Sequence, residues 1–190
     1  MPAEDTSKQP AAVGRNVVRR AIHRFRRDQD GATVVEFALI ALPFFAMMFA
    51  IIETALIFLV GQALDTATDD AARLIRTGQA QQQGFDAAEF KDSICDQIQS
   101  MLSCQEKLIL DVRTFEDFGS ADLSTPVVGG MLQDDEFGFD GGNGSDIVVV
   151  RAFYEWPAYT QFLGNGFLTL ANGNHLLVAT AAFRNEPFPW

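Results

Sequence analysis

The sequence predicts an α+β protein: a long, kinked N-terminal transmembrane helix, a second helix and a small antiparallel sheet. Three observations support this prediction. Residues 37–60 are almost free of charge, the helical spacing of apolar residues continues beyond them, and three strand-like segments follow in the C-terminal half. With 190 residues, the chain is long enough for one ordinary domain with an appended segment.

Charge is distributed unevenly along the chain. Residues 1–30 hold seven of the 14 Lys and Arg side chains against four acidic ones, whereas residues 31–190 carry a net charge of −14. Such an acidic body repels a phosphate backbone, so a nucleic-acid partner is excluded. The two His and two Cys are too few for a zinc site of the usual kind.

The apolar run over 37–60 predicts a membrane span. At 1.5 Å per residue it is about 36 Å long, and a bilayer core is roughly 30 Å thick. It is also too long for the apolar part of a secretory signal peptide. Because the basic residues precede the run, residues 1–31 are expected to form a cytoplasmic leader. The residues after the run are expected to lie on the other side of the membrane.

The helix is expected to cover 32–77, since apolar residues recur at helical spacing until Ile75 and Gly78 is a plausible stop. Pro43 removes a backbone donor, which predicts a kink. The Gln-rich residues 79–83 are interpreted as a linker. Asp86 and Glu89 then form an acidic capping pair that opens a second helix. Its apolar stripe would consist of Phe90, Ile94, Ile98 and Leu102.

An extracytoplasmic α+β domain is predicted over 78–190. Its strands are expected over 107–115, 146–156 and 175–183, where β-branched, aromatic and other apolar residues dominate. The Gly- and acid-rich residues 116–145 lack periodicity and are interpreted as a loop.

Cys95 and Cys104 are the only cysteines, and an oxidising compartment favours a disulfide between them over two buried free thiols. In the acidic loop, Asp134, Asp135, Asp140 and Asp146 could offer oxygen ligands to calcium, but an EF-hand pattern is absent and a solvated loop is the simpler interpretation. We therefore expect no metal and no cofactor. No nucleophile and base can be nominated, so an enzyme is not expected.

A short motif joins the basic leader to the apolar run. It reads Asp-Gly-Ala-Thr-Val-Val-Glu-Phe over residues 30–37, with Glu36 alone in an apolar context. A carboxylate at a membrane boundary is costly without a partner and is therefore a functional candidate. The junction resembles the processing site of type IV prepilins and pseudopilins. Glu36 followed by Phe37 is similar to the Glu-aromatic pair of the tight-adherence (Tad/Flp) branch.

Further residues resemble the TadE-like family of that branch. They are Gly31-Ala32, Val35-Glu36-Phe37-Ala38-Leu39, Pro43, Glu53, and the ending Phe183-Arg184-Asn185-Glu186-Pro187-Phe188. The resemblance covers roughly 31–60 and 183–188. It implies a type IV pilin-like fold and cleavage between Gly31 and Ala32 by a prepilin peptidase.

The resemblance also implies a function: a minor pilin or pseudopilin in a Tad-type pilus or related secretion system. Its partners would be other pilins, pilus assembly proteins and membrane lipid. Its location would be the bacterial inner membrane, with the C-terminal domain in the periplasm, or an extracellular pilus. Glu36, Phe37 and Glu53 would serve assembly, although Glu53 could either contact a neighbouring transmembrane helix or reach toward the periplasmic boundary. The alternative is an uncleaved single-pass anchor for a periplasmic binding module.

Overall fold

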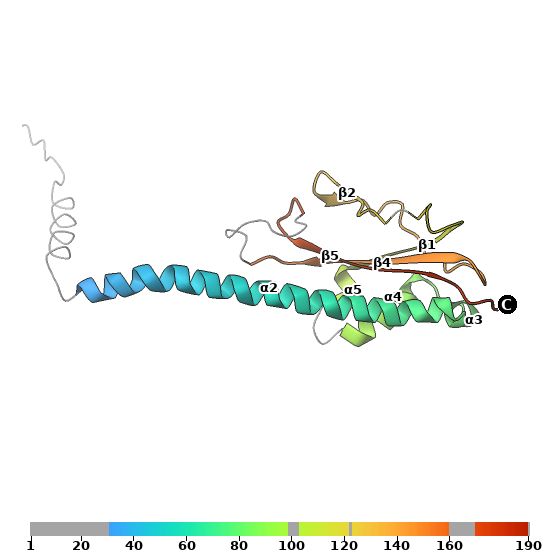
Figure 1. The fold of residues 1–190 in the computed structure, drawn as a ribbon, viewed down its shortest axis with the longest axis horizontal. Helices are drawn as coiled ribbons and strands as arrows, with labels where there is room; N and C mark the ends of the chain where they lie inside the picture. The colour runs from blue at the N-terminus through green and yellow to red at the C-terminus, as the bar shows by residue number, and fades with distance from the viewer. Residues whose placement is uncertain (1–30, 99–102, 122, 160–169, 190) are drawn as a thin grey trace, which may run out of the picture. The chain divides into compact units, whose positions relative to one another are not determined.

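The computed structural model describes residues 31–98, 103–121, 123–159 and 170–189 (Figure 1). The predicted leader, apart from Gly31, lies outside these residues. One compact unit spans Phe49–Trp190. The sequence placed the start of the C-terminal domain at residue 78, and the contacts in the structure add the preceding half of the long helix to the same unit.

The long helix is α2, which spans Ala32–Arg76 with Pro43 inside it. It changes character along its length. No side chain between residues 32 and 52 is buried, whereas from Glu53 onward one face is covered. The buried residues recur at intervals of mostly three and four: Glu53, Ile57, Val60, Leu64, Ala67, Thr68, Ala71, Ala72 and Ile75. Gly78 has a φ of 77°, a left-handed conformation that ends the helix as predicted.

The sheet has three antiparallel strands in the order β1-β4-β5. They are β1 (Leu108–Phe115), β4 (Ile147–Trp156) and β5 (His175–Arg184). The register pairs Leu108 with Tyr154 and Ile147 with Arg184. All three strands lie where the sequence predicted them, and the α+β class is confirmed.

The main core lies between this sheet and the helices on one of its faces (Figure 1). Besides α2, that face carries α4 (Ala87–Ile98), which begins with the predicted capping pair: the Asp86 carboxylate accepts hydrogen bonds from the Ala88 and Glu89 amides, and the Glu89 carboxylate accepts one from the Asp86 amide. The expected stripe residues Phe90, Ile94 and Ile98 are buried, and Leu102 lies outside the described residues.

Burial raises the pKa of the Tyr154 hydroxyl on β4.

Two segments differ from the sequence prediction. The Gln-rich stretch is a one-turn helix, α3 (Gln79–Gln83), because Gln favours helix and the Gln81 amide group donates to the Gly141 carbonyl at 2.7 Å. The acidic loop contains a hairpin of β2 (Val127–Val128) and β3 (Met131–Leu132). Its two turn glycines, at 129 and 130, both have positive φ. Strands of two residues are too short to produce a periodic pattern.

The loop over 116–145 covers the other face of the sheet through a buried ion pair. Nη2 of Arg151 lies 2.6 Å from Oδ2 of Asp111, whose side chain is 1% exposed. Arg151 also donates to the Ser124 carbonyl, and its guanidinium lies about 6 Å from the ring centroids of Phe137 and Phe153. A second apolar cluster surrounds this pair, with Phe137 stacked on Phe153. The pair therefore ties the loop to β1 and β4.

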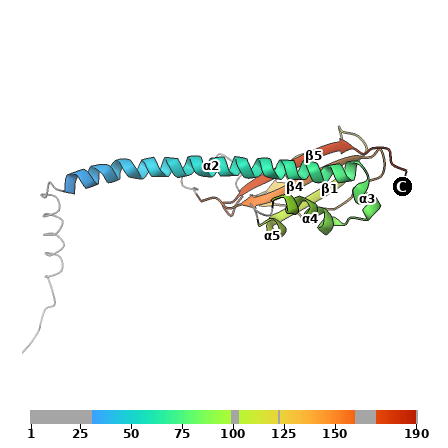
Figure 2. The same ribbon diagram turned by 90° about the horizontal axis from the view of Figure 1, so that it is seen from below.

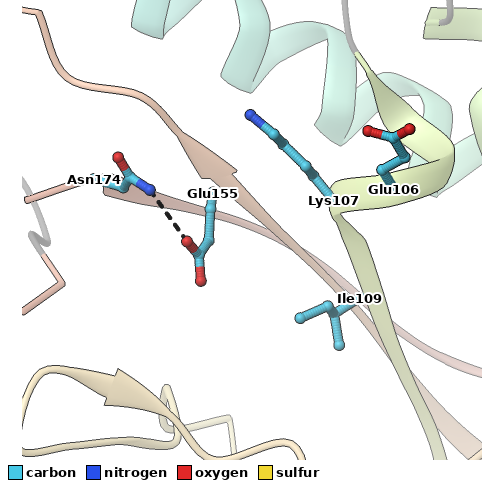
Figure 3. Close-up of a pocket in the computed structure, with 5 residues that line it drawn as sticks. All are labelled: Glu106, Lys107, Ile109, Glu155 and Asn174. Atoms are coloured by element: carbon cyan, nitrogen blue, oxygen red, sulfur yellow. Dashed lines mark hydrogen bonds between the residues drawn. The ribbon is translucent and has the colours of Figure 1, made fainter. Parts of the chain in front are cut away.

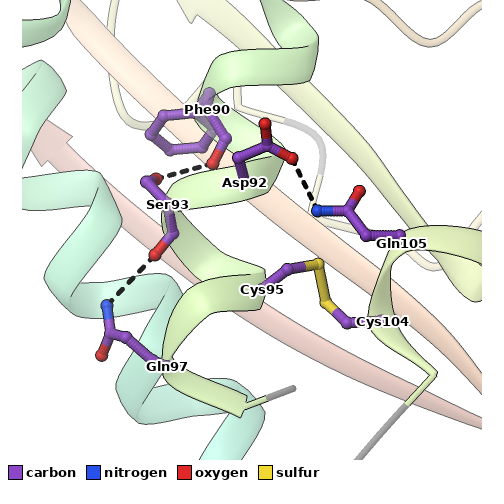
Figure 4. The surroundings of a disulfide bond; sticks show 7 residues. All are labelled: Phe90, Asp92, Ser93, Cys95, Gln97, Cys104 and Gln105. Atoms are coloured by element: carbon purple, nitrogen blue, oxygen red, sulfur yellow. Dashed lines mark hydrogen bonds between the residues drawn. A yellow bond between two sulfur atoms is a disulfide. The ribbon is translucent and has the colours of Figure 1, made fainter.

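A disulfide joins Cys95 on α4 to Cys104, as expected (Figure 4). Cys104 begins the four-residue α5 (Cys104–Lys107), which leads directly into β1. Nearby, the Gln105 amide group donates to the Asp92 carboxylate at 2.6 Å. The bridge thus fixes the end of α4 to the beginning of the sheet (Figure 2).

The double change of Cys95 and Cys104 to Ser should lower the free energy of unfolding of the compact unit by about 2.5 kcal/mol. The bridge closes a loop of nine residues, which restricts the unfolded chain by roughly that amount. Denaturant midpoints would measure the loss. Reduction of the wild-type protein is the control and should give the same value, and unchanged midpoints in both would contradict the prediction.

Asp111→Asn should cost about 3–5 kcal/mol, because it leaves the buried Arg151 guanidinium without its counter-charge. Arg113 supplies a matched control, since its Nε lies 2.8 Å from the other oxygen of Asp111 but its side chain is 37% exposed. Arg113→Gln should therefore cost under about 1 kcal/mol. Equal losses for the two variants in the same denaturant titration would argue against the assigned roles.

Candidate functional site: the N-terminal helix and its contacts

Gly31 and Ala32 lie at the start of the described chain, with Ala32 as the first residue of α2. A Cβ added to Gly31 would meet no atom within 4 Å, and its φ is not in the left-handed region. Neither packing against the described residues nor the backbone conformation therefore requires a glycine at this position. The candidate cleavage pair is sterically open.

Glu36 and Phe37 are both exposed on α2. They begin a long apolar surface in which large side chains remain open on all sides of the helix, including Phe37 at 69%, Leu42 at 75% and Phe44 at 60% exposure. α2 is the one helix in the described part of the chain that is long and apolar enough to cross a membrane, on length and composition alone. Such a surface suits lipid or other apolar helices rather than water.

Glu53 has a partner within its own chain, whereas the sequence suggested a neighbouring transmembrane helix or the membrane boundary. Its side chain is buried, and its carboxylate accepts a hydrogen bond of 2.6 Å from the backbone amide of Tyr159 in the same chain. Tyr159 follows β4, 106 positions further along the sequence. Glu53 therefore links α2 to the segment after β4. Sequence spacing alone could not identify a contact across that separation.

The C-terminal motif folds back onto the end of α2. The Glu186 amide donates to the Arg76 carbonyl at 2.9 Å, which satisfies one of the carbonyls that the helix end leaves open. The buried Asn185 amide group donates to the carbonyls of Gly141 and Asn143. At Gly78, an added Cβ would lie 2.7 Å from the ring of Phe188. The Arg-Asn-Glu-Pro ending thus packs against the C-terminal end of α2 and the loop at residues 141–143.

The acidic residues of the loop bond to protein groups. Asp140 accepts hydrogen bonds from the Thr114 hydroxyl and the Gly142 amide, and Asp146 accepts one from the Asn143 amide. Asp134 and Asp135 are exposed. Within the described ranges, no group of three His, Cys, Asp or Glu residues is arranged to hold a metal ion.

A shallow pocket of about 220 Å³ lies between the start of β1 and the end of β4 (Figure 3). Its lining is Glu106, Lys107, Ile109, Glu155 and Asn174. The Glu155 carboxylate accepts hydrogen bonds from the amide groups of Asn172 and Asn174, so its charge is engaged at the rim. These residues include no Ser, Cys or His that could act as a nucleophile with an adjacent base.

Glu53→Leu should make the Tyr159 amide exchange its hydrogen about 10- to 100-fold faster, because a hydrogen bond to a charged acceptor contributes about 1.5–3 kcal/mol. Glu53→Gln keeps a carbonyl acceptor in the same place and should have a smaller effect. Hydrogen–deuterium exchange on peptides that contain Tyr159 would measure both. Identical exchange in wild type and Glu53→Leu would show that the bond does not hold the segment.

Comparisons with known proteins agree with the resemblance seen in the sequence. No curated protein and no solved structure matches the chain. A family model, described as TadE-like protein, matches residues 31–73. The match begins at the candidate cleavage pair and covers nearly all of α2. The segment from Gly31 to Arg73, which carries the junction and both glutamates, is therefore TadE-like.

Proposed function

We propose that the chain is a minor pilin or pseudopilin that takes part in assembly of a Tad-type pilus or related secretion system, after a prepilin peptidase removes its leader. The family match supports association with a Tad pilus and, as partners, other pilus components. The role is one of assembly and needs no catalytic group or cofactor on this chain.

The observation that carries the proposal is the unexplained glycine at residue 31. Several glycines of the described chain have a positive φ or a close neighbour that excludes a side chain. Gly78, for example, has a positive φ and lies against Phe188. Gly31 has neither feature, which is also true of Gly61 and Gly138, but Gly31 alone of the three stands between an Arg-rich leader and the first residue of α2. A backbone without a side chain can enter a peptidase cleft, which gives the glycine a reason outside the folded chain.

The burial pattern of α2 supports a membrane anchor and limits its length. Residues 32–52 are apolar except for Thr33 and Glu36, have no buried side chain, and measure about 31 Å as a helix. This length matches a hydrocarbon core of roughly 30 Å. From Glu53 onward one face of the helix is buried against its own domain, so the periplasmic boundary of the membrane would lie close to Glu53.

The basic leader supplies the orientation. Positive residues stay in the cytoplasm, which sends the sheet domain to the periplasmic side of the inner membrane. The Cys95–Cys104 disulfide fits that oxidising compartment. During assembly, the apolar surface around Phe37 would leave lipid and pack against the helices of other pilins.

Glu36 then has a role that cleavage creates. Cutting after Gly31 gives Ala32 a free amino group one helical turn from the Glu36 carboxylate. An ion at the membrane boundary is costly alone, and pairing between the amine of one subunit and the Glu36 of another offsets that cost. The pairing favours one register between neighbouring helices.

An uncleaved anchor that displays a binding module is the second candidate, because α2 alone would suffice to hold the sheet domain at the membrane. The two candidates differ in the fate of the leader. An intact mass of the membrane-extracted protein separates them, since a chain beginning at Ala32 requires processing.

Gly31→Leu should leave the full-length precursor in the membrane, because the bulkier residue blocks entry to the peptidase while leaving the fold unaltered. Intact mass and N-terminal sequencing of the extracted protein would show the leader retained. Gly61→Leu is a matched control, since Gly61 also has open space around it and should be processed normally. Normal maturation of the Gly31 variant would refute the proposal.

Glu36→Gln keeps the size of the side chain and removes its charge. We expect normal insertion and largely normal cleavage, with co-purification of pilin partners reduced about tenfold or more, the effect of roughly 1.4 kcal/mol. Glu116→Gln removes one charge from the exposed loop and should leave assembly unchanged. Wild-type partner yield and full piliation in the Glu36 variant would show that the charge is not used in docking.

A further inference from the structure

The two edges of the sheet are treated differently by the rest of the chain. On β1, the outward N–H and C=O groups of Val112 are both used: the amide donates to the Gly138 carbonyl at 2.8 Å, and the carbonyl accepts from the Asp140 amide at 2.9 Å. A short parallel bridge between Val112 and Phe139 thus covers the middle of this edge. The other edge is β5.

The register identifies which groups of β5 face outward. The Asn185 amide donates to the carbonyl of Asp146, which stands opposite it just beyond the last paired residues. Because hydrogen-bonded and non-bonded pairs alternate in an antiparallel ladder, the odd-numbered residues of β5 bond to β4. The even-numbered residues Val178, Thr180, Ala182 and Arg184 therefore direct their N–H and C=O groups away from β4.

No hydrogen bond among the described residues uses these outward groups. The strand also lacks the devices that protect edges. Between His175 and Arg184 it has no charge, no proline and no bulge over ten paired residues. Thr180 and Ala182 are small and exposed, so their side chains do not shield the backbone. An open row of backbone donors and acceptors is a template for another strand.

A second copy of this chain does not fit that edge through antiparallel pairing of its β5 with this β5. Two identical strands that pair antiparallel are related by a twofold axis perpendicular to the sheet, and the same axis would reverse every other element. The part of α2 that packs on the sheet runs along the strands (Figures 1 and 2), so the two helices would point in opposite directions. Helices anchored from one side of a membrane must point the same way.

We propose that β5 is a docking edge to which an extended segment of a different protein adds as a fourth strand. Charge gives the chemistry of that segment. Arg184 is exposed at the end of the edge and makes no ion pair in the described part of the chain. The partner segment is therefore β-branched or apolar, with a carboxylate where it passes Arg184. The exclusion of a second copy rests on the proposed membrane anchor. The observation that the β5 edge is open does not depend on that proposal.

A photo-crosslinking amino acid at Ala182, in the full-length protein within its native membranes, tests this proposal. We expect an adduct with a different chain. Thr180→Pro removes one outward N–H while keeping every bond to β4, and should reduce the adduct about tenfold. Thr180→Val keeps that N–H and should crosslink as the parent does. Peptides covering 176–184 should also exchange hydrogen more slowly in the assembled state than after extraction in detergent.

Arg184→Glu tests the charge without changing the backbone, and keeps the proposal testable if the proline variant does not fold. It should reduce the adduct about tenfold, whereas Arg184→Lys should retain it. A missing adduct, an adduct with a second copy only, or equal yields in Thr180→Pro and Thr180→Val would overturn the proposal. Leader cleavage should be normal in all these variants, so failure here is distinguishable from failure of the proposed processing.

Discussion

The packing of one face of α2 against the sheet is the interaction on which the rest of the structure depends. From Glu53 to Ile75 this face holds the buried side chains of the helix, and from Val60 onward its apolar residues share one core with β1, β4 and β5. A three-stranded sheet has two faces to cover, and α2 with α4 covers one of them. The same helix continues toward Ala32 without a buried side chain. One helix therefore serves two surroundings, a protein core along part of its length and an apolar medium along the rest.

The second face of the sheet combines an apolar cluster with a buried ion pair. Asp111 and Arg151 stand opposite each other on β1 and β4, and Arg113 and the Gly138 amide complete the bonds of the carboxylate. A buried pair of this kind costs desolvation, so its value lies in the specific placement of the loop rather than in net stability. By fixing residues 124–138, it brings Phe137 over Phe153 and places Gly138 beside the edge of β1. The β1 edge is thereby covered at Val112.

These two arrangements bear on the proposed role in assembly. The apolar side chains of α2 near Phe37 are exposed, and the outward backbone groups of β5 make no hydrogen bond among the described residues. The first suits apolar helices within or emerging from a membrane, and the second suits an added strand. Glu53 connects the helix to the sheet domain, because its carboxylate accepts a hydrogen bond from the Tyr159 amide and so holds the segment after β4 to α2 at the proposed membrane boundary.

The sequence by itself determined the long helix, the capped second helix, the three strands, the disulfide and the TadE-like junction. Each of these is encoded locally: apolar periodicity over α2, the Asp86–Glu89 pair at α4, and apolar and β-branched runs in the strands. The tertiary structure decided the partner of Glu53, the pairing of Asp111 with Arg151, and the hairpin and the short α3. These contacts join residues far apart in the chain, or segments of two to five residues, and neither leaves a periodic signal. Which sheet edge is open also depended on the register, since only the alternation of backbone bonds shows that the even residues of β5 face outward.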